Sequence, residues 1–429
     1  MLKRIRIKGY KSLEDVEVEL NDLTVLVGAN ASGKSNFLDA VQFLSQLATS
    51  RTVEEAFDFP HRGQPLDSFA VTRDGWGEQN EKEKLAFSIE ADICLSKDTI
   101  NAVNRRIKTL LETDEVTDNS KKVVRSAVRE HNLRYRIEVE FLRNSGEVRV
   151  SDEYLAALNS RGEPKTAQNG RAPFIETSKK RINLRMEGSG RPTFHELGLN
   201  YTILSMAQYL PQYLPRYPHL EAARSEFASW NFYYLEPRER MRTPMAFKEE
   251  SNIGIMGEKL SIYLYTLKES NIEKFESLER AMRTLIPSIR SINPFRNKDN
   301  EIELRVNLEG KDYSAGVLSE GTLRLLGLLT TSGGGNNGEI PLVGFEEPEN
   351  GVHPGLVSLI ADFFRTQEYL GQTQYIVSTH SKELASELWE NLYLVEIENG
   401  RTAIQTNKSL GPLLQYITAE KAEYLLEQQ

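Results

Sequence analysis

The stretch that decides the fold lies near the start of the chain and reads Thr24-Val25-Leu26-Val27-Gly28-Ala29-Asn30-Ala31-Ser32-Gly33-Lys34-Ser35-Asn36. An apolar run typical of a β-strand leads into a loop bracketed by two glycines, and a helical pattern follows. This is the complete G-x-x-x-x-G-K-[ST] pattern in the strand–loop–helix context that it requires. The sequence therefore predicts a phosphate-binding loop and a site for a nucleoside triphosphate.

The residue types in this loop suit a phosphate ligand. Glycines let successive backbone N–H groups turn inward around an anion, and the N-terminus of the following helix adds partial positive charge. We expect Lys34 to reach the β- and γ-phosphates and the Ser35 hydroxyl to bind Mg²⁺. The predicted nucleotide-binding residues are Asn30, Ala31, Ser32, Gly33, Lys34, Ser35 and Asn36.

Composition limits the class of protein. The 429 residues are 39% hydrophobic and 27% charged, and their net charge of −9 argues against a surface that coats nucleic acid, although a local basic groove stays possible. The single cysteine, Cys94, excludes an intrachain disulfide framework and a cysteine-rich zinc site. No run approaches the roughly 18 apolar residues of a membrane span, and the N-terminus lacks a signal-peptide core. We expect a cytoplasmic protein without a membrane partner.

Periodicity predicts the order of elements along the chain. Strands are expected within residues 1–27 and again over 134–150 and from 300 onward, and helices over 36–50 and in most of 200–290. Residues 159–193 are expected to form an exposed hairpin or loop insertion. The predicted division is 1–95, 96–295 and 296–429. In the turn after the first strand, Lys11 either points to the nucleotide or is solvated, and the second alternative is favoured.

Two carboxylates follow a second apolar strand, at residues 342–345. A phosphate-loop enzyme needs an acid at a strand end for the Mg²⁺ shell and often a second one to activate water. We assign Glu346 to the metal side and Glu347 to the attacking water. A third apolar strand, Tyr375–Ser378, leads into His380, which at that position can hydrogen-bond a γ-phosphate.

A second candidate anion site follows at Ser319-Glu320-Gly321-Thr322. Ser319 is a natural N-cap for the apolar helical run after it, and Gly321 permits close approach. One nucleotide does not need two cradles in one chain. We therefore expect this helix to cover the nucleotide held by another copy of the chain; a purely structural capped helix is the alternative.

Together these motifs resemble the ABC-type ATPase heads of the RecF, SMC and OLD-like group. The matching stretches are Ile7–Leu13, Gly28–Asn36, Leu318–Gly321, Glu346–Pro354 and Ser378–Ser381. The resemblance implies an α/β fold, with a mixed sheet, a P-loop core and a large α+β insertion between the Walker A and signature motifs. It also implies ATP and Mg²⁺ as cofactors, and ATP hydrolysis.

The resemblance assigns roles residue by residue. Lys34 and Ser35 become the Walker A pair, and Glu346 and Glu347 the Walker B pair. The signature acting on a second copy becomes Ser319, Glu320, Gly321 and Thr322. Residues 349–353 become the D-loop, His380 the switch histidine, and Gln64 a candidate Q-loop residue on the metal.

Two positions depart from the family pattern. Glu346 stands where the Walker B aspartate is usual, so the water-mediated Mg²⁺ contact is displaced by one methylene and turnover is expected to be slow. Glu320 stands where transporters carry glycine, which places a carboxylate beside the γ-phosphate of the second copy and is expected to weaken closure.

The predicted function is an ATP-driven homodimeric switch that controls a separately encoded effector, such as a toprim- or HNH-type nuclease, in anti-phage defence. The alternative is a RecF-like DNA-binding ATPase of DNA repair, motivated by basic clusters at 105–129, 179–191 and 238–242. A transporter subunit fits the long insertion poorly, and a small-molecule kinase needs neither the signature helix nor His380.

Overall fold

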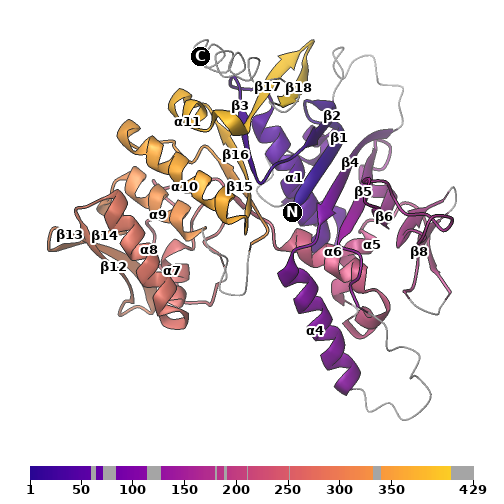
Figure 1. Ribbon diagram of the computed structural model, residues 1–429, viewed down its shortest axis with the longest axis horizontal. Coiled ribbons are helices and arrows are strands. Elements are labelled where there is room, and N and C mark those ends of the chain that lie inside the picture. Colours follow the sequence, from indigo (N-terminus) through magenta and orange to yellow (C-terminus); the bar gives the residue numbers. More distant parts are fainter. Residues whose placement is uncertain are drawn as a thin grey trace. The chain divides into compact units, whose positions relative to one another are not determined.

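The computed structural model describes residues 1–58, 64–70, 84–113, 127–178, 181–187, 191–209, 211–250, 252–331 and 340–406. These residues form two compact units, each built from separate stretches of the chain. Unit 1 contains the described parts of 1–20, 35–230 and 396–404. Unit 2 contains the described parts of 21–34, 231–395 and 405–429. Figure 1 labels the elements of both units.

Unit 1 is built on an antiparallel sheet in the order β2-β1-β4-β5-β6-β7-β8-β9. Alternating apolar residues pair across it, as in Ile5↔Val18 and Ile7↔Val16. Its strands are β1 (Leu2–Tyr10), β2 (Leu13–Glu19), β4 (Lys84–Cys94), β5 (Asn132–Leu142), β6 (Glu147–Ala157), β7 (Ile175–Thr177), β8 (Ile182–Leu184) and β9 (Thr193–His195).

Helix α1 (Lys34–Thr49) carries the expected apolar stripe and runs from the phosphate loop into unit 1. Its Phe43 ring lies 6.2 Å from the ring of Tyr10 and 5.7 Å from that of Phe87, so α1 covers the aromatic end of the antiparallel sheet. The other helical segments of this unit are α2 (Val53–Asp58), η1 (Pro65–Ser68), α4 (Lys97–Thr113), α5 (Ile203–Met206), η3 (Ala207–Tyr209), η4 (Pro211–Arg216) and α6 (Pro218–Ala228).

Unit 2 is built on a sheet in the order β10-β15-β16-β3-β17-β18. The pairs from β10 to β17 are parallel, and every residue of β3 and β16 is buried. The strands are β3 (Leu23–Val27), β10 (Asn231–Tyr233), β15 (Leu342–Glu346), β16 (Gln374–Thr379), β17 (Leu392–Glu398) and β18 (Arg401–Thr406), where residues 396–404 of the final hairpin belong to unit 1.

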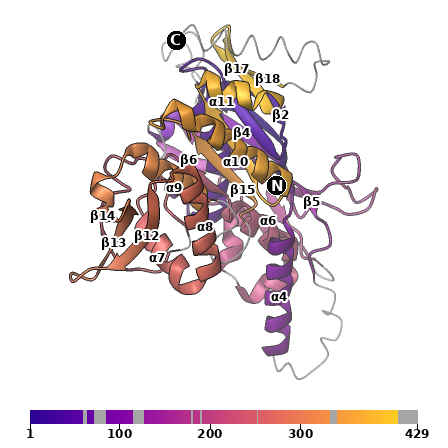
Figure 2. The same ribbon diagram turned by 60° about the vertical axis from the view of Figure 1, so that its left-hand side comes forward.

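A small antiparallel sheet, β11-β13-β12 with β14 on β13, completes unit 2. Helices α7 and α8 pack beside it, as the two views in Figures 1 and 2 agree. The elements are β11 (Met245–Ala246), α7 (Leu260–Ser270), α8 (Ile272–Leu285), β12 (Ile289–Arg296), β13 (Glu301–Leu308), β14 (Lys311–Ser314), η5 (Ala315–Val317), α9 (Glu320–Thr330), η6 (Pro354–Leu356), α10 (Val357–Leu370), α11 (Lys382–Glu387) and η7 (Trp389–Asn391).

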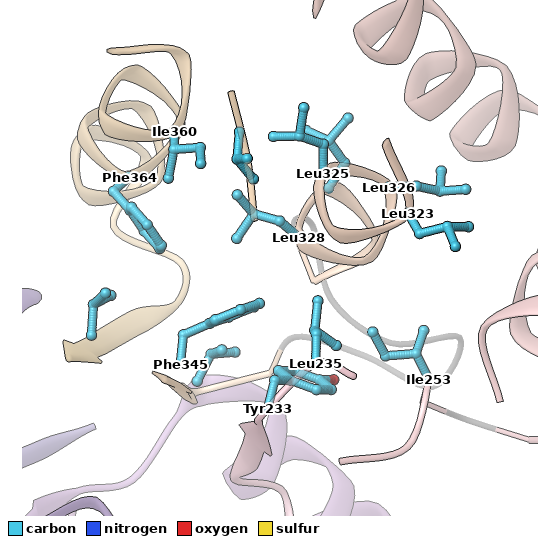
Figure 3. Packing of buried hydrophobic residues seen from close by; sticks show 14 of the residues in the cluster. Tyr233, Leu235, Ile253, Leu323, Leu325, Leu326, Leu328, Phe345, Ile360 and Phe364 are labelled. Carbon is cyan, nitrogen blue, oxygen red and sulfur yellow. The ribbon is translucent and has the colours of Figure 1, made fainter. Parts of the chain in front are cut away.

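One hydrophobic cluster joins the strands and helices of unit 2. Figure 3 shows the leucines of α9 above Phe345 of β15 and Tyr233 of β10, with Ile360 and Phe364 of α10 alongside. Burying a large apolar side chain contributes roughly 1.5–3 kcal/mol. Helix α9, which begins at the expected signature motif, is therefore held by the same core as the parallel sheet.

Most of the expected elements are present. Residues 200–290 are mainly helical, as expected, and also contain β10, β11 and the start of β12. One expectation needs correction. Lys11 is not a solvated turn residue: its side chain is 9% exposed, and its Nζ lies 2.6 Å from Asp39 Oδ2. The boundaries of the two units differ from the expected division at 95/96 and 295/296, because each unit contains distant stretches of the chain. The expected division into domains stays a prediction.

A buried carboxylate in unit 1 yields a pH-dependent prediction. Glu153 accepts hydrogen bonds from the Ile203 and Leu204 backbone N–H groups and from the Tyr135 hydroxyl. Burial nevertheless raises the pKa of Glu153 to about 7, against an ordinary 4.5. Between these values the folded chain keeps a proton that the unfolded chain has lost, so stability falls as pH rises through this window.

We expect the free energy of unfolding, taken relative to that of Glu153→Gln, to fall by up to ~3 kcal/mol as the pH rises from about 4.5 to about 7, and then to level off. Urea unfolding at a series of pH values measures this. Glu147→Gln is the matched control, because that side chain is exposed at the start of the same strand. A pH-independent difference between wild type and Glu153→Gln contradicts the prediction.

Candidate functional site

The expected motifs of unit 2 meet at one edge of its parallel sheet. Glu346 pairs with Ser378, and Thr379 pairs with Val27. Because β15, β16 and β3 are parallel neighbours, their carboxyl ends lie side by side. The loops that leave them are the phosphate loop after Val27, Glu347 after β15 and His380 after β16. Residues separated by more than 300 positions are thereby brought to one place.

The phosphate loop is tightly built around its first glycine. A Cβ on Gly28 would lie 2.0 Å from the Val395 carbonyl oxygen and 3.0 Å from Ser32 Oγ, so only glycine fits. Ala31, with φ of 60°, and Gly33, with φ of 107°, occupy the left-handed region. A left-handed non-glycine residue is strained, and such strain is characteristic of ligand-binding loops.

Lys34 is held inside this loop. Its Nζ donates to the carbonyl oxygens of Gly28, at 2.7 Å, and Ala29, at 2.9 Å, and the residue is 6% exposed. Burial lowers the pKa of Lys34, and the nearby carboxylates of Glu347, Glu346 and Glu349 act in the opposite direction. A buried ammonium held by two neutral carbonyls is a strong binding point for an anion.

The two acids at the end of β15 have different surroundings. Glu346 is the last residue of the strand, whereas Glu347 turns into the left-handed region with φ of 47°. The Glu347 N–H donates to the Ser378 carbonyl at 2.9 Å, which ties this turn to β16. His380 Nδ1 lies 3.1 Å from Glu347 Oε1, without the alignment of a hydrogen bond. The histidine and the carboxylate assigned to water activation are therefore neighbours.

A third acid was missed by the sequence reasoning as an individual site residue. Glu349 is 6% exposed, accepts a 2.6 Å hydrogen bond from Thr379 Oγ1, and has a pKa raised by burial. Its other oxygen, Oε2, has no hydrogen-bond partner among the described residues. In the sequence Glu349 is one of three acids in Glu-Glu-Pro-Glu, and nothing local indicates that it is the buried one.

Helix α9 carries the expected signature motif at its start. Ser319 caps it, as expected, by accepting a hydrogen bond from the Thr322 N–H at 3.1 Å. A Cβ on Gly321 would lie 3.2 Å from the Gly351 carbonyl oxygen and 3.3 Å from Val352 Cα. Gly321 therefore permits a close approach, as expected, and the backbone that approaches it here is the expected D-loop of the same chain.

Glu320 and Arg324 connect this helix to other charged groups. Glu320 Oε1 accepts a 2.7 Å bond from Arg238 Nε, so the carboxylate is paired. Arg324 is 7% exposed, its Nη1 lies 3.5 Å from the Glu347 carbonyl oxygen, and burial lowers its pKa. The buried guanidinium joins α9 to the turn after β15.

Three of the predicted site residues, Ser35, Asn36 and Gln64, belong to unit 1, and only their contacts within that unit are described. Ser35 is in the first turn of α1. Asn36 Nδ2 donates to Ser12 Oγ at 2.8 Å, which engages its amide within that unit. Gln64 is exposed before η1, and its backbone N–H donates to Asp67 Oδ2 at 2.8 Å. The metal-binding roles of Ser35 and Gln64 stay predictions.

The residues of unit 2 fit a magnesium–triphosphate ligand. Lys34, whose Nζ lies on the Gly28 and Ala29 carbonyls, supplies positive charge for phosphate at the N-terminus of α1. The carboxylate of Glu346 offers an oxygen ligand, and Ser378 Oγ and Glu349 Oε2 are buried without hydrogen-bond partners among the described residues. Oxygen donors of this kind suit Mg²⁺ and the waters that it keeps.

Part of the basic clusters is engaged within the chain. Arg106 pairs with Glu221 at 2.7 Å, Lys108 lies 3.7 Å from Glu112, and Arg181 stacks on Phe194. Residues 121–125 and 179–180 lie outside the described residues. No helix in the described part of the chain combines the length and apolar character needed to cross a membrane.

Comparison with known proteins places the chain among ATPases. Residues 105–386, well over half of the chain, match the family model described as "AAA domain, putative AbiEii toxin, Type IV TA system", and residues 1–186 match that of the "AAA ATPase domain". The fold resembles the SMC head crystallised with the C-terminal winged-helix domain of ScpA, with a TM-score of 0.52 and 13% identity over 94% of this chain and 97% of that one. The α/β ABC-ATPase fold is thus confirmed.

Shorter matches connect the chain to two named groups. The DNA replication and repair protein RecF of Streptococcus agalactiae is 31% identical over 77 residues, which are 17% of this chain and 21% of the relative. The OLD nuclease of Thermus scotoductus is 41% identical over 44 residues, 10% of this chain and 8% of that protein. The chain therefore spans about a fifth or less of these relatives, and the resemblance to RecF, SMC and OLD-like ATPases is confirmed at the level of the ATPase.

The close packing of Gly28 gives a direct test of the loop. Gly28→Ala is expected to weaken ATP binding roughly ten-fold or more, because the added Cβ collides with the Val395 carbonyl and displaces the loop. Isothermal titration calorimetry measures the affinity. Gly316→Ala is the control, since its Cβ would meet only the Ser314 hydroxyl oxygen, at 3.3 Å. Equal affinities for the two variants would show that the loop does not hold the nucleotide.

Proposed function

This chain belongs to the AAA-domain family whose description names the AbiEii toxin of type IV toxin–antitoxin systems, and from that premise we propose that it is an ATP-binding and ATP-hydrolysing switch protein that homodimerises around two ATP molecules. The observation that carries this proposal is the common edge of β3, β15 and β16. Lys34 begins α1 directly after the phosphate loop, and Glu346, Glu347 and His380 lie at the ends of β15 and β16 or just after them.

The placement of the charged groups supports the proposed hydrolysis. The phosphate loop and Lys34 would hold the triphosphate, and Glu346 and Ser35 would hold Mg²⁺, which would supply positive charge against the phosphate oxygens. Glu347 orients the attacking water and accepts its proton. His380, 3.1 Å from Glu347 Oε1, positions that carboxylate and responds to the γ-phosphate. Glu346 in place of the usual aspartate keeps turnover slow.

The signature helix supports the proposed dimer. Ser319 caps the N-terminus of α9, and Gly321 rests on Gly351 and Val352, the proposed D-loop of the same chain. Docking of this surface on the ATP of a second copy completes each site from two chains. ATP then binds the dimer more tightly than the single chain and so favours the dimer, which is the basis of a switch.

The output of the switch is a separately encoded effector, such as a toprim- or HNH-type nuclease, in anti-phage defence. Two comparisons support this proposal. The matched family description refers to a toxin–antitoxin system, which has two components, and one similar protein is an OLD nuclease. Co-purification of the chain with the product of a neighbouring gene tests it; purification without that product in both nucleotide states argues against it.

A RecF-like role in DNA binding is the second candidate, favoured by the 31% identity to RecF over 77 residues. Arg105 on α4 is an exposed cation that could contact phosphate. Arg106, the next residue, is paired with Glu221. DNA binding needs a basic surface, whereas the nucleotide-driven dimer does not. Measurements of DNA affinity therefore distinguish the two candidates.

We expect Lys34→Ala to abolish ATP binding, and Glu347→Gln to retain binding while losing hydrolysis by roughly a hundred-fold or more, because binding and water activation depend on different groups. Binding is measured by calorimetry and hydrolysis by phosphate release. The control is Glu303→Gln, an acid on β13 paired with Arg305. Retained hydrolysis in Glu347→Gln contradicts the role assigned to that carboxylate.

If the second candidate is right, affinity for duplex DNA falls roughly a hundred-fold or more between low and physiological salt, and Arg105→Gln lowers the logarithmic salt slope by about one. Fluorescence anisotropy at several salt concentrations measures both quantities. Binding that is absent, or that does not depend on salt, removes the DNA-binding candidate and leaves the switch as the function.

A further inference from the structure

The cluster Arg238-Glu239-Arg240-Met241-Arg242, one of the basic clusters of the sequence, forms a loop after β10. The Glu236 carboxylate accepts hydrogen bonds from the backbone N–H groups of Arg238, Glu239 and Arg240, at 2.9–3.1 Å. One carboxylate thus fixes three consecutive residues of the turn. We refer to residues 236–242 as the arginine loop.

The arginine loop contacts the signature region through hydrogen bonds and through an apolar side chain. Arg242 Nη1 donates to the Gly316 carbonyl at 2.6 Å and to that of Ala315 at 3.3 Å, just before the signature motif. Met241 is buried, and the place of a Cβ on Gly327 of α9 lies 3.1 Å from Met241 Cε. Polar and apolar contacts therefore hold the loop against η5 and α9.

Within this fixed loop one guanidinium is presented to solvent beside the signature motif. The Arg238 side chain is 77% exposed, and its Nε donates to Glu320 Oε1 at 2.7 Å. Glu320 occupies the second position of the signature Ser319-Glu320-Gly321-Thr322, where a bare carboxylate repels an incoming phosphate. Arg238 neutralises this carboxylate, and it is therefore the group that allows an anion to approach the motif.

An exposed ion pair is readily exchanged, because water screens both charges and competes for their hydrogen bonds. A triphosphate carries more negative charge than one carboxylate, and an arginine binds phosphate oxygens through paired N–H groups. Arg238 therefore gains by leaving Glu320 when a phosphate arrives. The paired state holds the guanidinium near the motif until then.

We propose that Arg238 is a trans-acting phosphate-binding residue, which leaves Glu320 and contacts the γ-phosphate of ATP bound to a second copy of the chain. The inference rests on the proposed ATP-dependent dimer and names a residue that closes its site. It also accounts for the acid in the signature. When ATP is absent, Glu320 holds Arg238 in place through their ion pair and repels other anions from the site.

Two pairs of variants test the trans contact, with all chains carrying Glu347→Gln to prevent hydrolysis. The first pair mixes Lys34→Ala chains with Arg238→Ala chains. The second pair mixes Lys34→Ala/Arg238→Ala chains with otherwise unchanged chains. Each mixed dimer has lost one Lys34 and one Arg238. In the first pair the intact Lys34 faces the intact Arg238 of the other chain, and in the second pair it does not.

The measurement is the association constant of the mixed dimer in ATP and Mg²⁺, from energy transfer between fluorescent proteins fused to the two chains. We expect the first pair to associate roughly ten-fold or more tightly than the second, as an arginine–phosphate contact across the interface requires. Equal constants, or a tighter second pair, overturn the proposal.

Two controls make the outcome unambiguous. Arg240→Ala replaces Arg238→Ala in a parallel series, since Arg240 is an exposed arginine of the same loop, and it is expected to leave the two pairs within about two-fold of each other. Failure of the unchanged Glu347→Gln chain to dimerise with ATP refutes the proposed dimer itself. Dimerisation of that chain with no difference between the pairs refutes only the role of Arg238.

Discussion

Parallel pairing of β15, β16 and β3 is the constraint on which the rest of the structure depends. The pairs Glu346↔Ser378 and Thr379↔Val27 fix the register so that three loops leave the sheet at one edge. A shift of one residue would turn every side chain of a strand to the other face. The buried apolar residues of these strands make such a shift costly, and so the hydrophobic core sets the geometry of the polar site.

The same core also holds the signature helix. The leucines of α9 pack in the cluster with Phe345 and with the residues of α10, while Gly321 lies against Gly351 and Val352 and Arg324 reaches the Glu347 carbonyl. The turn after β15 and α9 are therefore connected through packed atoms. This connection is the physical basis that the proposed switch requires.

Local sequence patterns predicted the elements that are decided locally. Val25 to Val27, the glycine loop and the apolar stripe of α1 form a strand–loop–helix unit whose signals lie within one window, as do Ser319 as a cap and the strand before Glu346. Strand β10 was missed because only three residues, Asn231 to Tyr233, form it, and their pairing partner lies more than 100 residues away. Lys11 and Glu349 were misjudged or missed for a related reason: their ion pair with Asp39 and hydrogen bond with Thr379 arise only in the folded chain.

The central claim is that each ATP site is completed by the signature residues of a second chain. A structure of the Glu347→Gln protein with ATP and Mg²⁺ tests it most directly, through the distance from the γ-phosphate to Ser319 Oγ of the other copy. The account predicts a dimer with two buried ATP molecules and that distance within hydrogen-bonding range, below about 3.2 Å. A single chain with ATP at Lys34 and its γ-phosphate open to solvent contradicts the account.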